Sequence, residues 1–505
     1  MINLNYLYFS FLYSFSVVSF YSYIISYFKS ILLNKILAVI GIIFDLNILI
    51  IFLILVFKIA FSRSQILFDL LIIVTFGVSI LFQIINKLRL YKHLSNVLYL
   101  KKSYLINLGI MIGFQLIILI SYFLKFNIFA LLSVLFSVLI FGAIFKNYRK
   151  LYRRKFNLNK FVDDNSLPSI SVAIPTRNET TDLINILKTV IDCDYPKLEI
   201  LVLDDCSSSP KTAQIIRQFS HDGVIFVQGN TPPKDFLAKN YAYQQLYDAS
   251  NGEYIIFMGV DCRVDRYFLR RIIEFMLTKN KKMVSVLPIN EIARKRDFYK
   301  VIPQTLRYSW ELAFFRRFVN RPPVLSSCWA TSRDLLLKFG GFEGLKKDII
   351  PERTIANQAL SLGDFYSFLI ANEQLKISSV KQYNEQLNTA IRVKYPTLKR
   401  NLGYILIIIT IQFMVFFLPI LEIINGFMNG NNLISYTFIV VLLINWVSYF
   451  FILKITTRKN LYFHSISYLW AFGLDIYLWV LSSLKYEFGK VVWKDRNICI
   501  PVRKF

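Results

Sequence analysis

The sequence has few of the residues that disulfide frameworks, zinc sites and fibrous chains require. Its 505 residues include five cysteines and three histidines. No two cysteines form a C-x-x-C pair, and the histidines are scattered singly. This pattern favours inert thiols and solvated or packed imidazoles over a zinc or redox site. The 18 glycines and 14 prolines are too few for fibrous or low-complexity classes.

Hydrophobic residues make up 55% of the chain and are gathered in long runs. The run from Ile36 to Phe57 contains one charged residue, and Ile405 to Leu421 contains none. About 20 apolar residues span the hydrocarbon core of a bilayer as a helix. The sequence therefore predicts an integral membrane protein, and it excludes a soluble enzyme, a secreted disulfide scaffold and a disordered chain.

The apolar segments divide the chain into membrane regions on either side of a long polar stretch. We expect spans near 4–27, 36–57, 66–86, 104–124 and 127–145, and again near 402–426, 433–453 and 464–484. The predicted division is 1–147, a membrane region of about five helices; 148–167, a basic linker; 168–395, an α/β domain; 396–485, a second membrane region of two or three helices; and 486–505, a basic tail.

The excess positive charge belongs to the loops between apolar segments. The segment Pro168–Pro396 holds 31 Lys+Arg and 24 Asp+Glu, which leaves 28 basic and 8 acidic residues elsewhere. Short basic loops mark the cytoplasmic side of a membrane, so nucleic acid is excluded as a partner and the α/β domain is predicted to be cytoplasmic.

A full span at 464–484 would put the basic tail outside. We therefore expect that segment, which holds Asp475, to be interfacial or re-entrant.

Strands and helices alternate through the polar segment. We expect strands at 170–174, 198–203, 224–227, 254–258 and 283–289, and helices at 180–191, 211–219, 235–249 and 265–277. This alternation predicts a mostly parallel, Rossmann-like sheet with helices on both faces. Ligands bind such sheets at the carboxyl ends of the strands.

Polar residues follow several of these strands directly. They are Pro175, Asn178, Glu179, Asp204, Asp205 and Asp261. Neither a G-x-G-x-x-G nor a G-K-[ST] loop is present, which excludes Rossmann-type dinucleotide binding and a P-loop. A single Asp at such a place is more often a helix N-cap than a ligand. Carboxylates at two strand ends together suit a sugar nucleotide, with one on the base or ribose and one on a divalent cation at the diphosphate.

The segments ISVAIPTRNE, LEILVLDDCSSS, GEYIIFMGVDCRVD, SSCWATSRDLLLKFGGFEG and IIPERTIANQAL, in this order, resemble glycosyltransferase family 2 with the GT-A fold. The resemblance covers roughly 168–365. The flanking apolar segments and the tail VVWKDRNI look like membrane-bound members that glycosylate lipids. The resemblance implies a UDP- or GDP-sugar donor, a divalent cation (Mg²⁺ or Mn²⁺), inversion at the anomeric carbon and a lipid or lipid-linked acceptor.

The resemblance also assigns roles to individual residues. Nucleotide-sugar binding falls on Pro175, Asn178, Glu179, Asp204, Asp205, Lys234, Lys239 and Asp261. Asp261 corresponds to the second carboxylate of the D-x-D motif, which binds the metal, and Glu352 corresponds to the general base. For the two lysines, a solvated helix face is an equally good interpretation.

The sequence departs from the family pattern at three places. Gly259 replaces the first D-x-D carboxylate, and Pro351 precedes Glu352 where the family has an acidic pair. A Q-x-x-R-W motif is missing, since Gln386 and Arg392 have the wrong spacing, and this argues against a processive synthase. The basic, aromatic stretch around 293–321 either lies in the lipid headgroup plane or packs on the sheet.

The sequence thus predicts a multi-pass cell-membrane enzyme that moves one sugar from a nucleotide donor to a lipid or lipid-linked acceptor. A processive polysaccharide synthase and a degenerate, non-catalytic relative that binds a partner remain as alternatives. A transporter is disfavoured because the apolar segments contain few carboxylates.

Overall fold

The computed structural model describes residues 128–152, 163–292, 303, 322–363, 365–398, 400–457, 461–488, 491–493 and 496–497. Two compact units divide the chain. One contains Leu398–Asn445 together with residues up to Val138 and the two C-terminal residues, and the other contains Leu139–Thr397 and Trp446–Arg503. The first four predicted spans and the basic, aromatic stretch around 293–321 lie outside the described residues.

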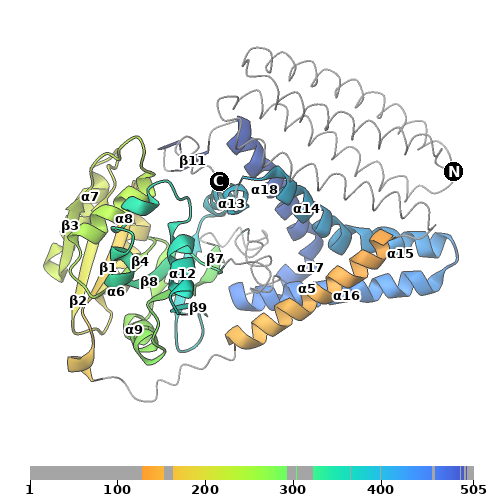
Figure 1. The fold of residues 1–505 in the computed structure, drawn as a ribbon, viewed down its shortest axis with the longest axis horizontal. Helices are drawn as coiled ribbons and strands as arrows, with labels where there is room; N and C mark the ends of the chain where they lie inside the picture. The colour runs from red at the N-terminus through yellow and green to blue at the C-terminus, as the bar shows by residue number, and fades with distance from the viewer. Residues whose placement is uncertain are drawn as a thin grey trace, which may run out of the picture. The chain divides into compact units, whose positions relative to one another are not determined.

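A seven-stranded sheet forms the centre of the second unit (Figure 1). Its order is β3-β2-β1-β4-β8-β6-β9, and only β8 runs antiparallel to its neighbours. The strands are β1 Ile170–Thr176, β2 Leu198–Asp204, β3 Val224–Gln228, β4 Tyr254–Met258, β6 Met283–Leu287, β8 Cys328–Ser332 and β9 Tyr366–Ile370. The predicted mostly parallel α/β sheet of GT-A type is confirmed.

Helices cover both faces of this sheet because both faces of its strands are apolar. On β1, Val172 and Ile174 belong to one buried cluster, and Ala173 between them belongs to another. Side chains alternate across a strand, so a continuous apolar run is typical of a sheet buried on both sides. The helices are α6 Thr181–Ile191, α7 Lys211–Gln218, α8 Ala238–Ala249, α9 Phe268–Thr278, α11 Arg333–Leu337 and α12 Pro351–Ser361, with short 3₁₀ turns at Asp164–Ser166, Ser220–Asp222 and Glu343–Leu345.

An aromatic cluster lies between the sheet and α8. Phe257 of β4 stacks on Trp329 of β8, with ring centroids 4.4 Å apart, because the two residues are opposite each other in the antiparallel pair. Tyr243 of α8 is 4.7 Å from Phe257, and Phe342 is 5.2 Å from Tyr243. Such pairs add about 0.5–1.5 kcal/mol beyond the area that they bury. The cluster therefore fixes α8 on the sheet.

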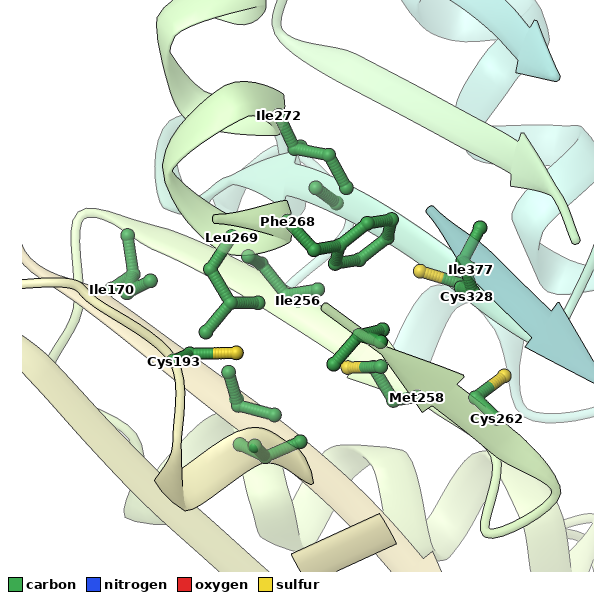
Figure 2. Packing of buried hydrophobic residues seen from close by; sticks show 14 of the residues in the cluster. Ile170, Cys193, Ile256, Met258, Cys262, Phe268, Leu269, Ile272, Cys328 and Ile377 are labelled. Atoms are coloured by element: carbon green, nitrogen blue, oxygen red, sulfur yellow. The ribbon is translucent and has the colours of Figure 1, made fainter. Parts of the chain in front are cut away.

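Three of the four described cysteines lie in the other buried cluster of the sheet, the one that contains Val172 and Ile174. Figure 2 shows Cys193, Cys262 and Cys328 among apolar side chains such as Ile256 and Phe268. All three are buried and free. Burial raises the pKa of Cys193 to about 12 and that of Cys262 well above its usual 9. A thiol is nucleophilic only as the thiolate, so burial disfavours reaction at these three cysteines.

A smaller sheet, in the order β5-β10-β7, lies next to the carboxyl end of β4. It consists of β5 Cys262–Val264, β7 Ile289–Ile292 and β10 Ile377–Lys381. β10 runs antiparallel to β5 and parallel to β7, with Ser379 opposite Cys262. This pairing brings residues from the end of the domain beside the turn that carries Asp261.

Three apolar helices are long enough to cross a membrane among the described residues: Ala130–Arg149, Gly403–Met428 and Asn432–Thr456. They belong to α5 Ile128–Tyr152, to α14 Leu402–Gln412 and α15 Leu418–Met428 joined by a π-helical turn at Phe413–Phe417, and to α16 Asn432–Thr456. These helices flank the α/β domain in the chain, as predicted.

The π-helical turn displaces backbone carbonyls that neighbouring helices then satisfy. Ser133 Oγ of α5 donates a hydrogen bond to the Met414 carbonyl at 2.7 Å, and Asn445 Nδ2 of α16 donates to the Val415 carbonyl at 2.6 Å. A free carbonyl in an apolar environment costs several kcal/mol. The two polar side chains therefore connect the three helices within the first unit.

The segment predicted at 464–484 forms α17 Leu461–Ile466 and α18 Tyr468–Phe488, and neither is among the three helices long and apolar enough to span. α18 packs on α13 Tyr383–Thr397, which follows β10. Buried Lys394 of α13 forms an ion pair with Asp475 of α18, whose other oxygen accepts a hydrogen bond from Trp479 Nε1 at 2.9 Å.

The compact unit that contains the sheet also includes residues beyond the predicted boundary at residue 396. α18 and a short hairpin of β11 Val492–Trp493 and β12 Arg496–Asn497 belong to the same compact unit as the sheet. The ion pair between α13 and α18 joins residues that lie 81 positions apart, for which the sequence has no local signal. An interfacial or re-entrant position for α18 stays a prediction.

Candidate active site

The turns after β1 and β2 form one polar edge of the large sheet. The two strands pair in parallel with Thr176 opposite Asp204, so the turns that follow are adjacent. The Asn178 amide donates to Ser207 Oγ at 2.8 Å, and Ser208 N donates to Asn178 Oδ1 at 2.8 Å. The structure therefore brings two of the predicted nucleotide-binding segments together at the carboxyl edge.

Asp204 and Asp205 have different surroundings, although both are buried. Asp204 Oδ1 accepts hydrogen bonds from the Ser207 amide at 3.1 Å and from the Ser207 hydroxyl. This closes a tight turn in which Cys206 has a left-handed φ of 50°. The geometry gives Asp204 a role in shaping the turn, and its predicted contact with the nucleotide stays a prediction, as does that of Asp205.

Arg177 stabilises the same turn, a role that the sequence did not indicate. Its Nη1 donates to the carbonyls of Asp205 and Cys206, both at 2.6 Å. Pro175 and Glu179 on either side of it are partly exposed at this edge. The Glu179 carbonyl accepts a hydrogen bond from Thr212 of α7 at 3.0 Å. The guanidinium thus connects the turn after β1 to the turn after β2.

Asp261 lies between β4 and β5 and contacts side chains of β10. Its Oδ2 accepts a hydrogen bond from the Ser379 hydroxyl and lies 3.5 Å from Lys381 Nζ. The sequence missed both partners because they lie more than 115 residues downstream. A strand pairing, rather than a motif, brings them to Asp261.

The absence of a side chain at Gly259 leaves space for the carboxylate of Asp261. A Cβ at this position would lie 2.7 Å from Asp261 Oδ1, well inside contact distance. The Gly259 amide also donates to the Ser327 carbonyl at 2.8 Å, which fixes the backbone. The side chain that the family pattern expects at 259 would therefore displace the carboxylate of Asp261.

The side chains around Asp261 do not fit a divalent cation held by the protein. Mg²⁺ prefers six oxygen ligands, and Ca²⁺ prefers six to eight. Asp261 supplies one carboxylate, and the ammonium of Lys381 already lies beside it. Within the described ranges, no group of three or more His, Cys, Asp or Glu residues is placed to hold a metal. The cation implied at Asp261 stays a prediction that this geometry disfavours.

Glu352, the predicted base, lies in the first turn of α12 and is fully buried, with its side chain 0% exposed. Lys239 of α8 forms an ion pair with its Oε1. In the part of the chain that the structure describes, its Oε2 has no hydrogen-bond partner. One oxygen is therefore held by a cation, and the other is buried without a donor among the described residues.

The two lysines predicted near the donor have different environments. Lys239 pairs with Glu352 and lies over the ring of Tyr243, 5.2 Å from its centroid. Burial, followed by the charge of Glu352, raises the pKa of the Tyr243 hydroxyl well above its usual 10. Lys234 is exposed in the loop before α8. Of the two, only Lys234 is solvated, which is the alternative to a role in donor binding.

Asn240 fixes the distance between α8 and α12. Its Nδ2 donates to the carbonyls of Leu345 at 2.7 Å and Asp348 at 2.8 Å, in the loop that leads to α12. The side chain is buried, so its hydrogen bonds are not exchanged with water. Asn240 thereby holds Glu352 within reach of the neighbouring Lys239.

Replacing Asn240 with alanine should lower the free energy of unfolding by about 1–3 kcal/mol, because it removes both of these buried hydrogen bonds. Urea unfolding of the detergent-solubilised chain measures this change. Asn230→Ala is the control, since that side chain is exposed and should change stability by no more than about 0.5 kcal/mol. Equal stability of the two variants would show that the Asn240 bonds contribute nothing.

Comparison with known proteins gives this site its class. The acidic turns lie at the carboxyl ends of the strands, where open α/β sheets bind their ligands. Residues 171–340 match the family model "Glycosyl transferase family 2". The chain thus carries a family 2 glycosyltransferase domain, and the predicted family and transferase class are confirmed.

Two curated relatives bear glycosyltransferase names. The chain is 25% identical over 218 residues to "Probable glycosyltransferase YdaM" of Bacillus subtilis (strain 168), covering 42% of this chain and 51% of that protein. It is 32% identical over 110 residues to "Glycosyltransferase AglE" of Haloferax volcanii, covering 21% and 34%. The matches span about half or less of these relatives.

A solved structure shows a distant similarity over a larger part of the chain. It is "Mannosyltransferase PcManGT from Pyrobaculum calidifontis in complex with GDP-Man and Mn2+". The identity is 16% and the TM-score 0.40, with 71% of this chain and 98% of that chain covered. A similarity of this size does not transfer ligands or residue roles.

Proposed function

We propose that the protein transfers a single sugar from a UDP- or GDP-sugar to a lipid or lipid-linked acceptor, with inversion at the anomeric carbon. The observation that carries this proposal is the polar edge formed by the turns after β1 and β2 within the family 2 domain. Ligands of parallel α/β sheets bind at this edge. Pro175, Asn178, Glu179, Asp205 and Lys234 would contact the nucleotide there.

In the proposed reaction, Glu352 is the general base. Its Oε2 takes the proton of the acceptor hydroxyl while the hydroxyl oxygen bonds to the anomeric carbon. The bond from that carbon to the diphosphate breaks, and the electron pair leaves with the nucleoside diphosphate. Lys239, whose ammonium pairs with Oε1, would orient the carboxylate for this step.

A degenerate, non-catalytic relative is the second candidate. The complete burial of Glu352 and its pairing with Lys239 favour it, because a base must reach the acceptor hydroxyl. The unpartnered Oε2 favours catalysis, because a buried oxygen without a donor costs free energy unless a ligand satisfies it. Transfer of sugar from a nucleotide donor separates the two candidates.

The test incubates the purified chain in lipid nanodiscs with UDP- and GDP-sugars and a membrane lipid extract. Single-sugar transfer gives sugar label in the organic phase, one nucleoside diphosphate released for each sugar, and no growth of the product with time. A product that lengthens continuously would favour the processive synthase. Binding of nucleotide without release would favour the non-catalytic relative.

We place the enzyme in the cell membrane as a multi-pass protein with its catalytic domain in the cytoplasm. The support is the set of three helices long enough to span and the basic loops beside the apolar segments. The boundaries at 147, 167, 395 and 485 remain part of this proposal. No nucleic-acid partner is expected.

Single cysteines introduced at exposed positions of the domain, such as Lys234, and at the tail beyond residue 486 should be protected from an impermeant thiol reagent in intact cells. They should react after the membrane is permeabilised. A cysteine in the uncharged loop at Asn429–Asn432 should react in intact cells, because this loop is expected outside. Labelling of the tail from outside would show that α18 spans the membrane.

Replacing Lys234 with alanine should weaken nucleoside diphosphate binding by roughly two- to fivefold, since an exposed charge contributes about 0.2–1 kcal/mol. Isothermal titration calorimetry measures the affinity. Lys211→Ala, on the exposed start of α7, is the matched control and should leave the affinity unchanged. An equal effect of both substitutions would show that only overall charge matters.

A further inference from the structure

Lys381 lies at the end of β10, where strand pairing brings it to the turn between β4 and β5. Its Nζ is 3.5 Å from Asp261 Oδ2, and its side chain is 21% exposed. The side chain of Asp261 is 11% exposed, and Ser379 from the same strand donates a hydrogen bond to the same oxygen. A carboxylate held on one side thus positions an ammonium that a ligand can still reach.

We propose that Lys381 is the cation that binds the diphosphate of the nucleotide-sugar donor, and that Asp261 positions its ammonium instead of holding a metal. This inference rests on the proposed function, because it needs a diphosphate ligand at this edge. It adds a binding residue and assigns a different role to Asp261.

The hydrogen-bonding capacity of Lys381 supports this role. An ammonium has three donors, and the contact with Asp261 is the one ion pair of Lys381 within the described residues. At 3.5 Å that contact is longer than a charge-assisted hydrogen bond, which is about 2.7–2.9 Å. At least two donors therefore remain for phosphate oxygens.

The local charge also favours the single positive charge of Lys381 over a divalent metal ion. The residue two positions before Asp261 is Gly259, so the turn carries one carboxylate, and one ammonium balances it. A divalent ion at Asp261 would also be repelled by the ammonium of Lys381, and this repulsion offsets part of its attraction to the carboxylate. Burial and the charge of Glu179 raise the pKa of Glu385 on α13, and the charge of Lys381 opposes this rise.

Gly259 makes this arrangement possible. Asp261 Oδ1 occupies the space that a Cβ at 259 would fill, at a distance of 2.7 Å. Any side chain there must move the carboxylate and with it the ammonium. Gly259→Ala should therefore disturb diphosphate binding without removing a charge.

The experiment measures UDP and GDP binding to the full chain in nanodiscs by calorimetry, in EDTA and in Mg²⁺. We expect the wild type to bind one of them in EDTA within about threefold of its affinity in Mg²⁺. Lys381→Met should weaken binding in EDTA by roughly 10- to 100-fold, the range for a lost charge-assisted hydrogen bond. Lys381→Arg should retain most of the affinity, and this shows that a loss in Lys381→Met is not misfolding.

Lys376→Met is the matched control, because Lys376 is exposed just before the opposite end of β10 and should not change binding. Binding that needs Mg²⁺ and is unaffected by Lys381→Met would overturn this inference and leave the proposed function intact. Absence of UDP and GDP binding in either buffer would count against the proposed function and the inference together.

Discussion

Glu352→Gln should lower the turnover of sugar transfer by about 10²- to 10⁴-fold, the usual contribution of a general base. Glutamine keeps the shape of the side chain and can still occupy the buried site at the start of α12, but its amide cannot accept the acceptor's proton. The diphosphate is expected at the turns after β1, β2 and β4, so nucleotide affinity should stay within about threefold. Steady-state kinetics and calorimetry on the same sample separate the two effects.

Glu343→Gln is the control for this prediction. Glu343 is exposed in the 3₁₀ turn that precedes α12, so its substitution removes the same charge from the same segment without touching the buried pair. Its turnover should equal that of the wild type. Unchanged turnover in Glu352→Gln would mean that another group is the base, or that the acceptor is already ionised, as a lipid phosphate is.

Lys239→Met should lower the free energy of unfolding by about 3 kcal/mol, because it leaves the carboxylate of Glu352 buried and without its cation. The side chain of Lys239 is 19% exposed, and this partial exposure puts the expected loss near the lower end of the range for buried pairs. In the double variant Lys239→Met with Glu352→Gln, no buried charge remains. Most of the stability should therefore return.

A double-mutant cycle from urea unfolding measures this coupling between Lys239 and Glu352. Lys188→Met on the exposed side of α6 is the matched control and should change stability by no more than about 0.5 kcal/mol. If Lys239→Met and the double variant were equally destabilised, the pair would not be coupled. The ion pair between α8 and α12 would then contribute nothing measurable to the free energy of unfolding.

The sequence predicts the architecture of the domain well because its signals are local. Apolar runs bounded by Pro, Gly and Asp define β1, β2 and β4, and the structure places these strands within one or two residues of the expected bounds. Their parallel order follows from the helices between them. The neighbouring turns that contain Asn178 and Asp204 are therefore predictable as one edge.

The partners of the site residues are not predictable in the same way. Lys381 and Ser379 reach Asp261 through a strand pairing across more than 115 residues, and Lys239 reaches Glu352 across 113. A single sequence contains no signal for such separations. The motif shows only that Gly259 lacks a carboxylate, whereas the structure adds that a side chain at this position would meet the carboxylate of Asp261.

The contact between α18 and α13 is unpredictable for the same reason. Hydropathy marks 464–484 as an apolar segment, and loop charge alone argues against a span there. The buried pair of Lys394 and Asp475 gives this segment a specific partner on α13. A charged pair between two helices has no periodic signature. The sequence therefore indicates that 464–484 is an unusual apolar segment, but it does not indicate the contact with α13.

Transfer of labelled sugar to lipid is the most direct test of the proposed function. The full chain in nanodiscs would receive a sugar-labelled UDP- or GDP-sugar with membrane lipid extract, and label would be counted in the organic phase beside the nucleoside diphosphate released. The account predicts equal amounts of both for the wild type and a loss of about 10²- to 10⁴-fold for Glu352→Gln. Nucleotide binding without release, and no label in lipid for either protein, would contradict it.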